Sequence, residues 1–134
     1  MVKLVELYLI STVTFFAIDF VWLSTMTSRF YQTHLDDLLL EKPNLPIAAA
    51  FYLLYVIGVL VLAALPAHEK GQVAVAIWRG AVFGLLAYGT YDLTNLSTLK
   101  GWSWQVSVVD MIWGAVITGT VATVAYYAAR WLDV

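Results

Sequence analysis

The chain contains no cysteine and only two histidines, His34 and His68, among its 134 residues. The lack of cysteine excludes disulfides, cysteine-ligated zinc and thiol nucleophiles, and two histidines are too few for a histidine-rich metal site. Basic residues are scarce as well, with seven Lys and Arg against nine Asp and Glu, and they form no run that would attract a nucleic acid. No phosphate loop or metal-ligand spacing is present. We therefore expect no cofactor, no bound metal and no nucleic-acid partner.

Charge of either sign is rare. Charged residues make up 12% of the chain, hydrophobic residues make up 62%, and the mean hydropathy is +0.82. A soluble domain is usually about half apolar and about a quarter charged. A chain of this size cannot bury so much apolar surface, because small domains leave much of their surface exposed. The composition predicts an integral membrane protein.

Four apolar stretches are long enough to cross a bilayer, which takes about 20 helical residues at 1.5 Å each. The clearest lies between Pro46 and Pro66, and proline is typical of the first turn of a helix and of the residues just after its end. The sequence predicts an all-α, polytopic membrane protein: a four-transmembrane-helix bundle that forms one domain over residues 1–134. The predicted spans are about 4–26, 47–65, 73–99 and 107–131.

Only the connection between the first two spans is long. Within it, Tyr31, Leu35, Leu38 and Leu39 recur at helical spacing, while the acidic residues face elsewhere. We interpret residues 28–41 as a short interfacial helix that lies on the membrane and can act as a lid. An ordinary polar loop is the alternative.

The orientation follows from the number of spans and the position of the basic residues. Four spans place both termini on one side of the membrane. That side would carry four of the Lys and Arg residues and the other side three, so the positive-inside rule favours cytoplasmic termini by a narrow margin.

Small residues recur at helix-packing spacing, as Gly80 and Gly84 in the third span and Ala115 and Gly119 in the fourth. Such pairs let two helix backbones approach closely. They predict close packing within the bundle, or between two copies of the chain in a homodimer.

Three aspartates lie inside the predicted spans, where an ionisable side chain is costly and indicates a functional site by default. Asp19 and Asp92 lie near the ends of the first and third spans, and Asp110 lies near the start of the fourth. The first and third spans end at the same face of the membrane at which the fourth span begins. At 1.5 Å per residue, all three carboxyls therefore lie within roughly 10 Å of that face. We expect the three acids at one depth.

Aromatic residues accompany these acids. Each of two D-x-x-W motifs, residues 19–22 and 110–113, places an acid and an indole on one helix face, and a polar stripe surrounds Asp92 in the third span. Lys100 is the only cation close enough to offset the acids. The pattern predicts an acidic, aromatic-walled pocket that opens toward the 28–41 segment. The expected ligand-binding residues are Asp19, Trp22, Tyr88, Asp92, Asn95, Lys100, Asp110 and Trp113.

Simpler roles exist for several of these residues. Ser107 and Asp110 match a capping box, so Asp110 can be a helix cap, a pocket residue or both. Trp102 and Trp104 fit an interfacial aromatic belt better than a ligand site. Hydrogen bonds among the acids, Asn95 and the indoles could also serve only to hold the bundle together.

The stretch YDLTNLSTLKGW, residues 91–102, followed by D-x-x-W-G in the last span, resembles a family of bacterial predicted membrane proteins called domain of unknown function 2177. The D-x-x-W of the first span fits the same pattern, and the resemblance covers essentially the whole chain. It implies a four-span protein of the bacterial inner membrane. It also implies a link to fatty-acid or lipid modification, because genes for that chemistry often neighbour those of family members. The family-motif positions, which carry no assigned roles, are Asp92, Asn95, Lys100, Gly101, Trp102, Asp110 and Trp113.

The predicted pocket favours functions of three classes. The first is the binding of a membrane lipid or other amphiphile, with the tail among the helices and the head group at the acids. The first alternative is a proton- or cation-coupled small-molecule transporter that uses Asp19, although small four-span exporters lack the further acids at 92 and 110. The second alternative is a membrane-embedded lipid-modifying enzyme, with the aspartates as an acid–base pair or as metal ligands beside His34. No nucleophile motif supports this enzyme.

Overall fold

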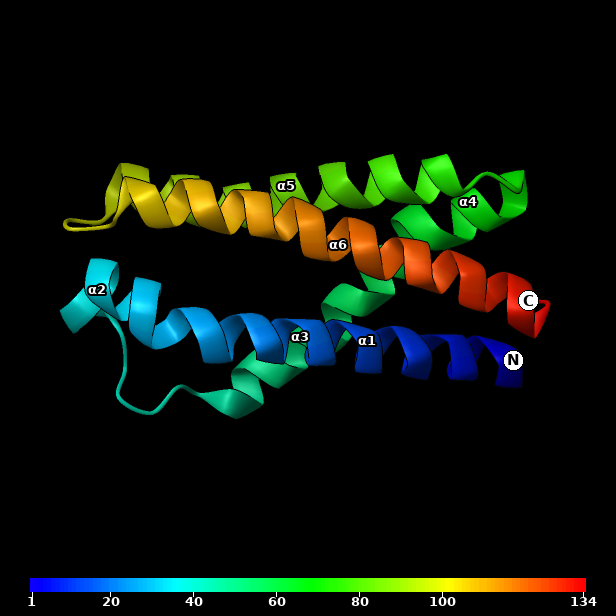
Figure 1. Ribbon diagram of the computed structural model, residues 1–134, viewed down its shortest axis with the longest axis horizontal. Helices are drawn as coiled ribbons and strands as arrows, with labels where there is room; N and C mark the ends of the chain where they lie inside the picture. The colour runs from blue at the N-terminus through cyan, green and yellow to red at the C-terminus, as the bar shows by residue number, and fades with distance from the viewer.

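A computed structural model describes all 134 residues as helices joined by short connections, without a strand. Helices α1, α5 and α6 run along the long axis of the molecule, whereas α3 and α4 form a tilted rod that crosses them (Figure 1). A π-helical turn, Thr27–Tyr31, joins α1 to α2, and a second, Leu60–Ala64, joins α3 to α4. The helices are α1 (Val2–Met26), α2 (Gln32–Leu35), α3 (Leu45–Val59), α4 (Leu65–Lys70), α5 (Val73–Thr98) and α6 (Trp104–Leu132).

Four continuous helical segments are long and apolar enough to cross a membrane: Val2–Leu38, Leu45–Lys70, Val73–Thr98 and Trp104–Leu132. The predicted all-α fold with four spans is confirmed. The segment predicted as an interfacial helix is helical to Leu38, but it continues α1 through the π-helical turn instead of forming a separate helix, and residues 39–44 are irregular. Its position at the membrane surface stays a prediction.

Side-chain caps set the starts of two of the spans. Asn44 accepts a hydrogen bond from the Ile47 backbone N–H at 3.2 Å, just before α3. Ser103 accepts from the Val106 N–H at 3.2 Å, and α6 therefore begins at Trp104. The capping-box interpretation of Ser107 and Asp110 is wrong, because both residues lie inside a helix that another serine caps.

The second span does not end at Pro66, as the sequence suggested, but passes through it to Lys70. Proline has no backbone N–H, so it removes the usual hydrogen-bond donor of the residue four positions earlier. That residue is Leu62, within the π-helical turn. Arg79 of α5 donates from Nη1 to the Leu62 carbonyl oxygen at 3.3 Å. The arginine thus supplies the donor that Pro66 lacks, and ties α5 to the interrupted span.

This interpretation predicts coupling between Arg79 and Pro66. We expect Arg79→Met to lower the free energy of unfolding by about 1 kcal/mol in the native chain, a typical value for a polar contact in a membrane bundle. The loss should shrink in a Pro66→Ala background, because alanine restores a backbone N–H donor for the Leu62 carbonyl. A double-mutant cycle of unfolding in mixed micelles measures the difference. Arg130→Met is the control, since Arg130 contacts Tyr126 on its own helix. If Arg79→Met lowers the free energy of unfolding equally in the native and the Pro66→Ala backgrounds, Arg79 does not replace the donor that Pro66 lacks.

Helices α5 and α6 form the most extensive contact in the bundle, and glycines from both helices make it possible. A Cβ atom on Gly80 would lie 2.8 Å from Ala122 Cβ, and one on Gly84 would collide with the carbonyl group of Gly114. The predicted small-residue motif of the third span is therefore used within the bundle. Gly119 has ordinary room, with Ala81 N 3.5 Å from an added Cβ. Homodimerisation stays a prediction.

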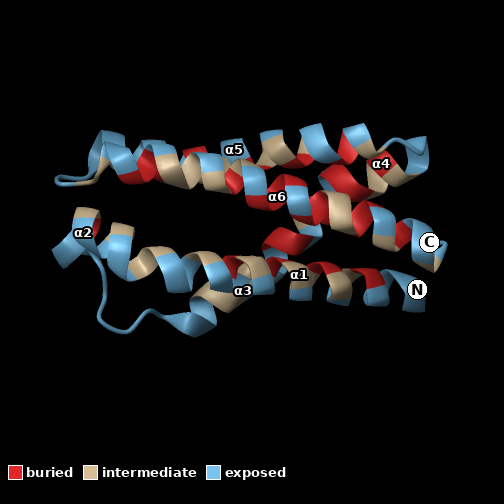
Figure 2. Cartoon of the chain, viewed as in Figure 1, coloured by how far each residue is buried: buried red, intermediate tan, exposed pale blue.

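The apolar core lies in the middle of the bundle and toward the end that carries both termini (Figures 1 and 2). At that end Lys3 Nζ donates to the Asp133 carbonyl oxygen at 3.5 Å. The opposite end, here called the loop end, carries α2 and the α5–α6 connection, residues 99–103. Along the first helix no residue after Asp19 is buried until Leu35. The core is therefore thin at the loop end, and it is there that polar side chains enter the bundle.

Candidate functional site

Three aspartates from three helices lie near one another toward the loop end. Asp19 of α1 is 5% exposed, Asp92 of α5 is fully buried, and Asp110 of α6 is half-buried. The charge of Asp110 acts on both of the other carboxyls. The structure thus places Asp110 within electrostatic reach of both Asp19 and Asp92.

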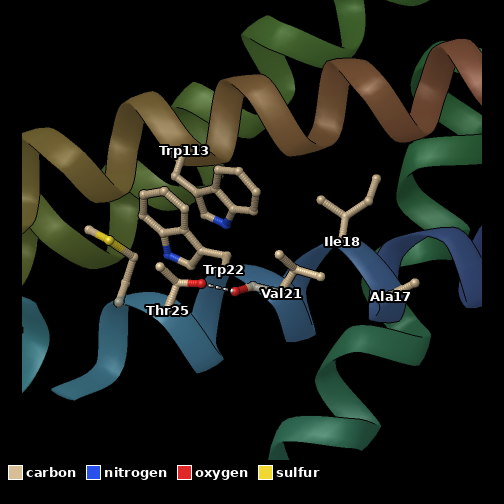
Figure 3. A pocket seen from close by; sticks show the side chains of 7 residues that line it. Ala17, Ile18, Val21, Trp22, Thr25 and Trp113 are labelled. Carbon is tan, nitrogen blue, oxygen red and sulfur yellow. Dashed lines mark hydrogen bonds between the residues drawn. The ribbon is translucent and has the colours of Figure 1, made fainter. Parts of the chain in front are cut away.

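Two tryptophans stack between α1 and α6. The rings of Trp22 and Trp113 are 4.1 Å apart between centroids and nearly parallel, at 7° (Figure 3). Trp113 donates from Nε1 to Asp19 Oδ1 at 3.4 Å. Trp22 donates from Nε1 to the Tyr31 hydroxyl at 3.0 Å, and Tyr31 donates in turn to Asp110 Oδ1 at 2.8 Å. The tryptophan of each D-x-x-W motif is therefore linked by hydrogen bonds to the aspartate of the other motif, directly for Trp113 and through Tyr31 for Trp22.

This reciprocity follows from the direction of the two helices. Helices α1 and α6 run antiparallel (Figure 1). A motif on one helix then meets the same motif on the other in reversed order: the indoles stack, Trp113 reaches Asp19 directly, and Trp22 reaches Asp110 through Tyr31. Two equal motifs on antiparallel neighbours were the sequence signal for this cross-pairing.

Tyr31 is the site residue that sequence reasoning missed. It is nine residues from Trp22, and at about 100° per residue an unbroken α-helix would place the two on opposite faces. The π-helical turn Thr27–Tyr31 inserts about one residue and reduces the rotation by about 100°. The turn therefore brings the tyrosine hydroxyl back toward the acids.

Asp92 differs from the other two acids. Both of its carboxyl oxygens are buried without a hydrogen-bond partner. Its backbone carbonyl oxygen lies 3.3 Å from Ser107 Oγ, which also accepts from Trp102 Nε1 at 3.1 Å. Trp102 is thus tied into the bundle, whereas Trp104 is 61% exposed, as an interfacial anchor would be. The contact with Ser107 thus holds the main chain of Asp92, while the buried carboxyl group lies near that of Asp110.

The remaining predicted residues, Tyr88, Asn95 and Lys100, form no hydrogen bond with the three aspartates. Tyr88 packs against Gly114 and the Tyr55 ring. Asn95 is half-buried, one turn beyond Asp92 on the same helix. Lys100 is exposed at the loop end. The structure does not bring Lys100 to the acids as their counter-charge.

A metal site has no structural basis in these side chains. The His34 ring lies with Nδ1 2.9 Å from the Phe30 carbonyl oxygen of its own helix. No three His, Asp or Glu side chains lie close enough together to hold a metal ion.

A groove with a cavity volume of about 600 Å³ lies beside the tryptophan pair on the α1 side (Figure 3). None of the three aspartates lines it, so the cavity is apolar and not the acidic pocket that the sequence suggested. Both indoles line the groove, and their N–H groups donate to Tyr31 and to Asp19, so the groove and the acids adjoin the same tryptophan pair. The lining residues are Ala17, Ile18, Val21, Trp22, Thr25, Met26 and Trp113.

These features define a membrane protein with four apolar helices and an acid–tryptophan cluster between them. The chain belongs to the family described as predicted membrane protein, domain of unknown function 2177 (DUF2177), whose model matches residues 4–127. The family membership predicted from the sequence is confirmed. No curated protein and no solved structure matches the chain.

Proposed function

We propose that the protein binds a membrane lipid or other amphiphile, with its tail in the groove beside Trp22 and Trp113 and its head group toward the acids. The observation that carries this proposal is the contact between an apolar groove and a buried polar cluster across one pair of stacked indoles. An amphiphile needs both environments within the length of one molecule.

The size and position of the groove suit an acyl chain. Its volume of about 600 Å³ falls within the range of about 300–1,000 Å³ that is typical of small-molecule sites. Its lining comes mainly from the middle and loop-end half of α1, within a stretch predicted to cross the membrane. Neighbouring side chains such as Phe20, 73% exposed, face outward, so a tail could enter sideways from the bilayer.

The cellular setting is part of the same proposal. A multi-pass protein of the bacterial inner membrane with cytoplasmic termini would hold the acids near the periplasmic face. Binding of a lipid there would suit an accessory role in fatty-acid or lipid modification. A transporter would use the same acids, and would differ by releasing protons when an amphiphile binds.

The test is the lipid that remains bound during purification. We expect the wild-type protein to retain a stoichiometric amphiphile, identified by mass spectrometry of the extracted sample. Ala17→Phe should lose it, because the new ring fills the groove without touching the hydrogen-bonded cluster. Val13→Phe is the matched control, since Val13 is 67% exposed outside the groove. Equal retention by all three proteins would show that the groove is not the binding site.

A further inference from the structure

The acidic cluster has no counter-charge within the chain. No Lys, Arg or His side chain interacts with Asp19 or Asp92. Arg29 and Lys100 belong to the loop end, but both are exposed. A buried acid usually has a basic partner or several hydrogen bonds, because removing it from water is otherwise costly. In this cluster, neither basic partners nor hydrogen bonds fully offset the cost of burying the carboxyls.

Asp92 shows this most clearly. The residue is fully buried, and neither carboxyl oxygen has a hydrogen-bond donor. The carboxyl interacts with Asp110, which is a second acceptor and not a partner of opposite charge. Asp110 and Asp19 each accept a hydrogen bond through Oδ1, and a carboxylate has acceptor sites beyond one such bond. The carboxyl oxygens of the cluster therefore have acceptor sites that no hydrogen bond within the bundle uses.

Aromatic side chains lie next to the three aspartates. The stacked indoles of Trp22 and Trp113 lie on the groove side, and Tyr31 bridges one of them to Asp110. The carboxylates of this cluster would attract a positively charged organic group and repel an anionic head group.

We propose that the ligand has a cationic head group of the amine or quaternary ammonium class, bound among Asp19, Asp92 and Asp110 with its tail in the groove. This inference rests on the amphiphile-binding function and names the chemistry of the head group. An ammonium group supplies N–H donors or positive charge to the free acceptors, and thereby completes the compensation that the chain lacks.

The experiment compares ligands that differ only in the head group. The full-length protein in nonionic micelles is exposed to an equimolar mixture of hexadecylamine and hexadecanol, and the adducts are counted by native mass spectrometry. We expect the amine to exceed the alcohol by about tenfold, a difference of about 1.4 kcal/mol. Asp92→Asn and Asp19→Asn should each bring the ratio toward one. Asp37→Asn, an exposed site with the same loss of charge, should leave the ratio unchanged.

Each outcome decides between the two proposals. Equal binding of amine and alcohol by the wild type, with both lost in Ala17→Phe, would overturn the cationic head group and leave the amphiphile site standing. Failure of both ligands to bind would contradict the amphiphile site itself. An amine preference that survives in both aspartate variants would show that the positive charge is bound elsewhere, and would also overturn the inference.

Discussion

Gly84→Ala should prevent α5 and α6 from packing together and yield a chain that no longer folds to one state in detergent. An added Cβ at this position would overlap the carbonyl oxygen of Gly114 and lie 2.6 Å from its carbonyl carbon and from Thr118 Oγ1. The backbone of a neighbouring helix cannot move away as a flexible side chain can. We expect a loss of at least about 3 kcal/mol in the free energy of unfolding, at the upper end of the range for overpacking.

Gly119→Ala is the matched control, because it makes the same chemical change on the facing helix. Its new Cβ would have ordinary contacts, with Ala81 N at 3.5 Å, and alanine favours a helix over glycine by about 1 kcal/mol. Unfolding in mixed micelles should therefore show a severe loss for Gly84→Ala and little change or a gain for Gly119→Ala. Similar stabilities for the two variants would refute this α5–α6 packing.

Hydropathy predicted the fold because a membrane span is defined by length and apolarity alone. All four predicted spans fall within or closely match observed helices, and the three aspartates were placed at a common end by counting residues along alternating spans. The π-helical turns and the course of the helix through Pro66 could not be predicted from hydropathy. Pro66 looks like a stop signal, yet the helix passes through it because Arg79, distant in sequence, donates to the Leu62 carbonyl oxygen.

The sequence indicated which acids and tryptophans lie near one another better than it indicated their geometry. The D-x-x-W motifs indicated the acids and the tryptophans, but not that the indoles stack on each other and line an apolar groove. Tyr31 was missed because a π-helical turn changes the face on which it lies, and no periodicity rule predicts such a turn. Lys100 was assigned to the acids by its proximity in sequence, whereas the helix end leaves it exposed.

Trp113→Ala is expected to abolish ligand binding, because this one indole walls the groove, stacks on Trp22 and donates to Asp19. Truncation of a packed tryptophan typically costs about 3–5 kcal/mol, so the variant must first be shown to remain helical and monodisperse. Trp131→Ala is the control, since Trp131 is 80% exposed at the other end of α6. Photolabelling with a diazirine-bearing single-chain amine measures binding, and should fall to background in Trp113→Ala alone.

Mapping of that photolabel on the wild-type protein tests the central claim most directly. The chain carries a second apolar groove, of about 460 Å³, between α5 and α6 and lined by residues such as Ile77, Ala81 and Ala115, which provides an internal comparison. We expect the label on residues 17–26 and on Trp113, competed away by unlabelled hexadecylamine. Labelling spread evenly over the lipid-facing surface, or concentrated on the α5–α6 groove, would contradict an amphiphile site at the stacked tryptophans.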